Sequence, residues 1–96
     1  MSGGRPVALL TPGFAAAHGS FVVRFAGRRS FGVTIVITAP GGRRLWQTSR
    51  EEHPGPASLR VALPKADTRH GRFVVLTARF TVGGRSITLR AVIRFR

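Results

Sequence analysis

Hydrophobic and polar residues alternate along most of the chain with a period of two, which is the pattern of strands that bury one face. The alternation is clearest at the C-terminus, where one face carries Ile87, Leu89, Ala91, Ile93 and Phe95. Only Val92 interrupts the polar face opposite. This pattern, together with shorter apolar runs, predicts seven strands, at residues 6–10, 20–25, 31–38, 43–48, 58–63, 72–82 and 85–96.

Glycine and proline residues separate these strands. Pro40-Gly41-Gly42 and Gly83-Gly84 predict two tight hairpins, because glycine supplies the positive φ that such turns need. Polar loops are expected at residues 49–56 and 65–71, and residues 14–18 can form one helical turn between two glycines. The chain is therefore expected to be all-β, a seven-stranded antiparallel β-sandwich. Its length predicts a single domain at residues 6–96, preceded by a disordered N-terminal arm at residues 1–5.

The alternating positions also predict the core of this sandwich. Its expected members are Phe21, Val23, Phe25, Val33, Ile35, Ile37, Leu59, Val61, Leu89, Ala91 and Ile93. The strand at 72–82 is ambiguous, because both of its faces are largely apolar. Its outward face is expected either to meet a partner or to be covered by loops and by the aliphatic stems of arginines.

Four motifs between residues 19 and 96 carry a resemblance to known modules: Ser20-Phe21-Val22-Val23-Arg24-Phe25, residues 58–64, Gly71-Arg72-Phe73 and Gly83-Gly84-Arg85-Ser86. On these motifs the chain resembles the Ig-like or fibronectin-III-like modules of secreted and cell-surface bacterial proteins. Family members often have a tyrosine at the position of Phe73, and its hydroxyl bonds back to the preceding loop. The resemblance implies an Ig-like sandwich, an extracellular or cell-surface location, and a structural, spacer or adhesive role.

Composition narrows the classes of function. The absence of cysteine excludes disulfides and thiolate metal sites, and no apolar run is long enough to span a membrane. The net charge of +13, from 16 basic and three acidic residues, favours polyanions as partners. The N-terminus is a poor signal peptide because Pro12 and Gly13 break its apolar stretch. A cytoplasmic location therefore stays open beside the extracellular one.

No set of side chains has the spacing of a catalytic or metal site. Glu51 and Glu52 are adjacent, so they point apart in an extended chain, and Asp67 is remote in sequence. The histidines stand singly in expected loops, at His18, His53 and His70. A zinc site would need all three to converge. The sequence therefore predicts a protein that is not an enzyme and that carries no metal or cofactor.

The outer face of the last strands is the strongest candidate for binding. If strand 85–96 pairs with 72–82, and 72–82 with 31–38, this face gathers Arg79, Arg90, Arg94, Val36 and Val92. Arg43, Arg44 and Trp46 near the first hairpin are further candidates, because guanidinium groups bind phosphate or sulfate and an indole stacks on a base.

Two functions fit this surface. One is a module that mediates assembly or adhesion, through a protein partner or through self-association. The other is a small basic protein that binds a polyanion such as nucleic acid. A third interpretation, a solvated surface whose charges only prevent sheet aggregation, stands beside both.

Overall fold

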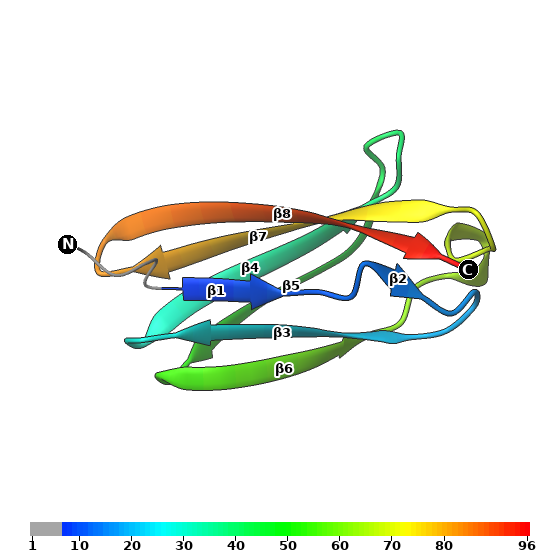
Figure 1. Cartoon of the computed structure of the whole chain (residues 1–96). Coiled ribbons are helices and arrows are strands. Elements are labelled where there is room, and N and C mark those ends of the chain that lie inside the picture. Colours follow the sequence, from blue (N-terminus) through cyan, green and yellow to red (C-terminus); the bar gives the residue numbers. More distant parts are fainter. Residues whose placement is uncertain (1–6) are drawn as a thin grey trace.

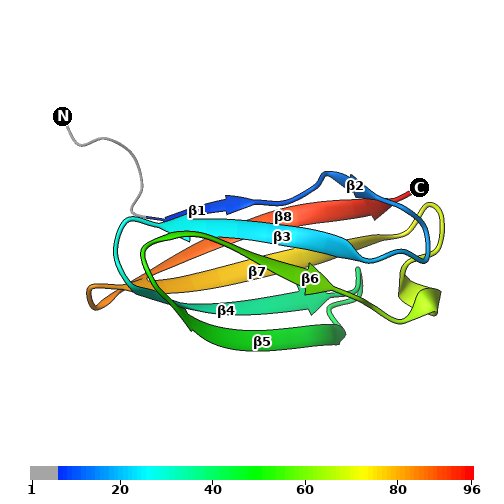
Figure 2. The same cartoon turned by 90° about the horizontal axis from the view of Figure 1, so that it is seen from below.

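Two β-sheets pack face to face in the computed structural model, which describes residues 7–96 (Figure 1 and Figure 2). The strands of this part are β1 (Val7–Leu10), β2 (Phe14–Ala15), β3 (Phe21–Gly27), β4 (Phe31–Thr38), β5 (Arg44–Glu52), β6 (Gly55–Val61), β7 (Phe73–Val82) and β8 (Arg85–Phe95). A short 3-10 turn, η1 (Lys65–Asp67), lies between β6 and β7. The N-terminal arm expected at residues 1–5 lies outside the described residues.

The strand order confirms an all-β sandwich and corrects its details. One sheet has the order β1-β3-β6 and the other β2-β8-β7-β4-β5. The expected pairings of the last strand with β7, and of β7 with β4, are confirmed. The strand count of seven and the purely antiparallel pairing are wrong, because residues 7–96 form eight strands and β2 runs parallel to β8.

The segment from β1 to β2 passes from one sheet to the other. β1 pairs with β3, and β2 then pairs with the end of β8. The amide of Arg94 donates to the carbonyl of Gly13 at 3.0 Å, and the amide of Arg96 donates to that of Ala15 at 2.9 Å. These hydrogen bonds explain why residues 14–15 form a strand where a helical turn was expected: the extended segment satisfies backbone groups at the end of β8.

The prediction of a polar loop at residues 49–56 is wrong. β5 continues to Glu52 and β6 begins at Gly55, so residues 53–54 alone connect them. Pairing with β4 extends the strand, since Arg50 lies opposite Val33 and Glu52 lies opposite Phe31. β5 is the last strand of its sheet, so polar side chains along it reach water without disturbing the ladder.

The hairpin expected at Gly83-Gly84 is confirmed. Val82 and Arg85 are paired, so the turn contains the two glycines alone. Their φ angles are +56° and +80°, which is the backbone that a two-residue hairpin requires and that glycine adopts without strain.

The core lies between the two sheets and matches most of the expected positions. Eight of the eleven expected residues are buried: Phe21, Val23, Phe25, Val33, Ile35, Ile37, Val61 and Ile93. The other three, Leu59, Leu89 and Ala91, are half-buried, because β6 lies at a sheet edge and the narrower three-stranded sheet covers β8 only partly. The ambiguous strand β7 turns Val74, Leu76, Ala78, Phe80 and Val82 inward.

Candidate binding surface

The outer face of the five-stranded sheet gathers arginine, valine and threonine side chains in register. One row across the sheet contains Arg90, Thr77 and Val36, and the next contains Thr88, Arg79 and Thr34. On the other side of the first row, Val92 lies opposite Val75. We call this surface the arginine–valine face; its defining residues are Val36, Val75, Val92, Arg79, Arg90 and Arg94.

The valines form an apolar strip on this face. Val75 and Val92 are direct cross-strand partners, and Val36 lies one row away on β4. Val92 is 46% exposed, and Val36 and Val75 are half-buried. β7 contributes Val75 because its outward positions are the odd-numbered residues from Phe73 to Thr81, which settles the face that the sequence left open.

The arginines flank the strip, and their guanidinium groups are exposed to solvent. Arg79, Arg90 and Arg94 are exposed, and none of them has an ion-pair partner within residues 7–96. Arg90 and Arg94 are four residues apart on one face of β8, a span of about 13 Å at the rise of a β-strand. The guanidinium of Arg94 lies 5.7 Å from the ring centroid of Phe73, its cross-strand partner, and this cation–π contact orients it over the sheet.

Two candidate residues from the sequence, Arg43 and Trp46, do not join this surface, and a third, Arg44, lies at its margin. Arg43 lies in the turn between β4 and β5, and its Nη2 donates to Oδ1 of Asp67 at 2.9 Å. Arg44 begins β5 at the far edge of the sheet, on its outer side, in the same row as Thr38, Val75 and Val92. Trp46 lies opposite the buried Ile37 and packs against the core, so its indole is on the inner side of β5 and cannot stack on a ligand of the arginine–valine face.

Two of the acidic side chains form ion pairs, and one of the histidines lies in a turn. Oε2 of Glu52 forms an ion pair with Nε of Arg50 at 3.0 Å, and Asp67 pairs with Arg43. His18 has a positive φ of 60° and sits in the turn that follows β2, where its amide donates to the carbonyl of Thr68. Across residues 7–96, His, Asp and Glu side chains do not gather in any group of three that could hold a metal ion.

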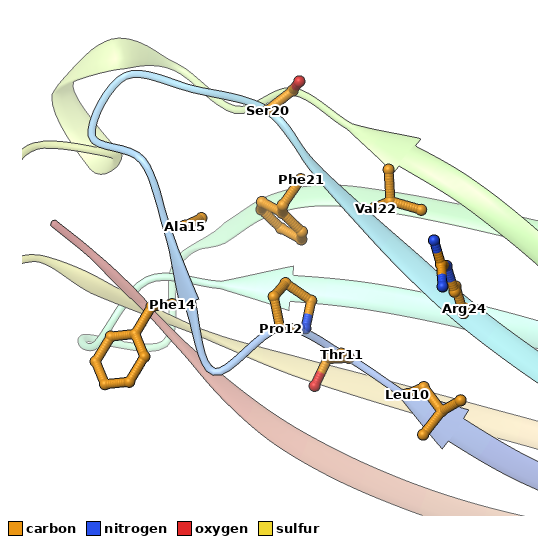
Figure 3. Close-up of a pocket in the computed structure, with 9 residues that line it drawn as sticks. All are labelled: Leu10, Thr11, Pro12, Phe14, Ala15, Ser20, Phe21, Val22 and Arg24. Atoms are coloured by element: carbon orange, nitrogen blue, oxygen red, sulfur yellow. The ribbon is translucent and has the colours of Figure 1, made fainter.

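A second surface, which the sequence did not indicate, lies on the other side of the sandwich (Figure 3). A groove of about 440 Å³ separates the β1–β2 segment from the start of β3, with Leu10, Pro12 and Phe14 along one side and Val22 and Arg24 along the other. Leu10 is 67% exposed and Phe14 is 50% exposed, with the guanidinium of Arg96 stacked 3.4 Å from the centroid of the Phe14 ring. The groove is open to solvent, and Arg24 is the one charged residue in its lining.

Comparisons with known proteins add no relative: no family model matches the chain, and a search of curated proteins also finds no match. Within residues 7–96, no helix has the length and hydrophobicity needed to cross a lipid bilayer.

Proposed function

We propose that this protein is a non-enzymatic Ig-like module that mediates structural assembly or adhesion through its arginine–valine face, at the cell surface or outside the cell. The strand order supports the Ig-like assignment. β1-β3-β6 and β4-β7-β8 have the neighbours of strands A-B-E and C-F-G in an Ig sandwich. The ion pairs of Glu52 and Asp67 support a role without catalysis, because they occupy two of the three acidic side chains.

The observation that carries the proposal is the apolar strip of Val36, Val75 and Val92 on an outward sheet face. Interfaces between proteins combine an apolar centre with arginine, and monomeric proteins seldom expose a large continuous apolar patch. Here the strip lies between Arg90 and Arg94 on one side and Arg79 on another. An outer face of this composition suits a protein partner, including a second copy of the chain.

Light scattering during size-exclusion chromatography tests the role of the strip. The +13 charge opposes stacking of two such faces, and this repulsion fades as the Debye length falls from about 10 Å at 0.1 M salt to about 3 Å at 1 M. We therefore expect association to rise with added sodium chloride and to be lost in Val36→Thr/Val92→Thr. The control Val22→Thr changes a half-buried valine on the outer face of the opposite sheet and should have no effect. Loss of association in the control alone, or a monomer at every salt concentration, refutes the proposal.

The arginines favour polyanion binding as a second candidate function. Arg79, Arg90 and Arg94 share one face without acidic partners in the described chain. If they contact phosphate or sulfate, log affinity for duplex DNA should fall linearly with log salt concentration, by close to one unit per contact.

A matched pair of double variants tests this second function. Replacing Arg90 and Arg94 with glutamine should lower the salt slope by about two. The control pair Arg24→Gln/Arg60→Gln removes the same charge from the outer face of the three-stranded sheet. An equal loss in both pairs would mean that binding depends on net charge and not on the arginine–valine face.

A further inference from the structure

β5 presents a long, unpaired edge of the five-stranded sheet. It pairs with β4 on one side, and no other strand of residues 7–96 lies on the other side (Figure 2). Its nine residues span about 30 Å at the rise of a β-strand. Backbone N–H and C=O groups along such an edge can pair with a further strand.

The other edges of the two sheets carry the usual features that prevent pairing. β1 has only four residues, and β6 contains Pro56, which lacks an N–H. At the opposite edge of the five-stranded sheet, Arg85, Arg90 and Arg94 of β8 would repel a second copy, and β2 covers the end of this strand. β5 has no proline, and its Arg44, Arg50, Glu51 and Glu52 sum to zero charge in a chain of net charge +13. A second positively charged copy therefore meets least repulsion at β5.

We propose that β5 pairs antiparallel with β5 of a second copy of this chain, about a two-fold axis that passes through Thr48. This surface is separate from the arginine–valine face, and the inference does not depend on that face. The charge order along the strand carries it. Basic Arg43 and Arg44 precede or begin β5 and acidic Glu51 and Glu52 end it, so an antiparallel copy sets opposite charges against each other.

The register follows from the strand ends and from an irregularity in β5. A two-fold axis perpendicular to the sheet pairs outward residues with outward residues. Moving this axis by one residue along the strand therefore shifts each residue's partner by two residues. With the axis at Thr48, the two strands overlap along their full length and Gln47 lies opposite Ser49 of the second copy. The β4–β5 ladder shifts after Trp46, so that Arg44, and not Leu45, lies opposite Thr38. This bulge turns Arg44 to the outer side, where Glu51 of the second copy is its nearest acid.

Moving the axis by one residue removes this complementarity. With the axis at Gln47, the same bulge sets Arg44 against Ser49 of the second copy, so Arg44 no longer faces an acidic residue. With the axis at Ser49, Glu51 lies opposite Gln47 of the second copy and Arg44 has no counterpart. The Thr48 register is therefore the one that joins the full strand and pairs its charges.

A charge exchange tests the pairing by sedimentation equilibrium. Arg44→Glu and Glu51→Arg each place like charges at two symmetric positions of the dimer, so each should raise its dissociation constant about tenfold. The double variant Arg44→Glu/Glu51→Arg should restore it. Arg44→Glu also lowers the net charge, which by itself would favour association, so a weaker dimer cannot come from overall charge. The control Arg60→Glu makes the same charge change on β6 and should not weaken the dimer.

Single cysteines test the register, because the chain has no cysteine of its own. Under mild oxidation Thr48→Cys should give a disulfide-linked dimer, since directly opposite residues have Cα atoms about 4.5–5.5 Å apart. Gln47→Cys and Ser49→Cys should cross-link when mixed and much less when alone. Ser58→Cys, on exposed β6, is the matched control.

The two experiments together decide the inference. It is overturned if the chain sediments as a monomer at every concentration, if the exchanged pair does not recover, or if Ser58→Cys cross-links as well as Thr48→Cys. Val36→Thr/Val92→Thr leaves β5 unchanged, so its effect on salt-promoted association is a separate outcome.

Discussion

Substitution of Gly27 tests the packing at one end of the sandwich. Gly27 is buried at the end of β3, between Val7 of β1 and Gly55 of β6. A Cβ atom added there would lie 2.8 Å from Cε1 of Phe31 and 3.1 Å from the carbonyl oxygen of Arg29. The Phe31 ring has little room to move, because its centroid is 6.0 Å from that of Phe25 and 5.8 Å from that of Phe80.

These contacts set the magnitude expected for Gly27→Ala. Overpacking of a filled core costs about 1–3 kcal/mol. Loss of backbone freedom in the unfolded chain returns about 0.4–1 kcal/mol when glycine becomes alanine. The difference between these ranges is about 0–2.6 kcal/mol, and the close approach to the Phe31 ring favours its upper part. We therefore expect the free energy of unfolding to fall by about 1–2 kcal/mol, and the Tm of a domain of this size by about 4–16 °C. Urea and thermal unfolding, followed by far-UV circular dichroism, measure both values.

A matched control and a double-mutant cycle isolate the cause. A Cβ at Gly41 meets nothing within 4 Å, so Gly41→Ala should change stability by no more than about 0.5 kcal/mol. Phe31→Leu removes the obstructing ring, and in that background Gly27→Ala should cost at least about 1 kcal/mol less. Strictly additive costs in the cycle, or a Gly27→Ala protein as stable as the wild type, would refute the reasoning.

Three further predictions concern the turn, an ion pair and the tryptophan. Gly84→Ala should cost about 1 kcal/mol in urea unfolding, because φ is +80° there, and Gly84→Asn should cost less since asparagine tolerates that backbone. Asp67→Asn should cost less than about 1 kcal/mol, because its partner Arg43 is 69% exposed and solvent screens the pair. The fluorescence of Trp46 should shift to longer wavelength on unfolding, yet stay unchanged when heparin binds the folded protein, because the indole lies on the inner side of β5.

The sequence was a good guide where local pattern decides the structure. β3, β4 and β8 alternate with a period of two and form where expected, and Gly83-Gly84 sets the last hairpin. β2 and the second half of β5 were missed for a common reason. Each is held by pairing with another strand, β2 with β8 and the second half of β5 with β4, while its own residues carry little strand signal.

The candidate surface was predictable to the same extent. Arg79 lies on β7, and Arg90 and Arg94 lie on the adjacent strand β8, so their shared face follows from the period of two once the strand order is known. Trp46 was wrongly expected on the outer face. The register shift in β5 places Trp46 on the inner side, opposite Ile37, and Arg44 on the outer side, and local sequence does not reveal that shift. The groove beside Leu10 depends on how the β1–β2 segment crosses between the sheets, which no local pattern encodes.

The parallel contact between β2 and β8 has a mechanical consequence. β1, which begins at Val7, and the C-terminus lie toward opposite ends of the sandwich (Figure 1), whose longest dimension is 42 Å. Tension between them pulls β2 and β8 in opposite directions along their common axis. Three hydrogen bonds link the two segments: the amide of Arg94 to Gly13, that of Arg96 to Ala15, and that of Ala17 to the carbonyl of Arg96. Because the strands are parallel, the load reaches all three bonds together and does not open them one after another. The β2–β8 contact thus resists tension in shear, together with the pairing of β1 with β3, and the force at which the domain opens depends on how fast these terminal contacts rupture and not on the stability of the whole core.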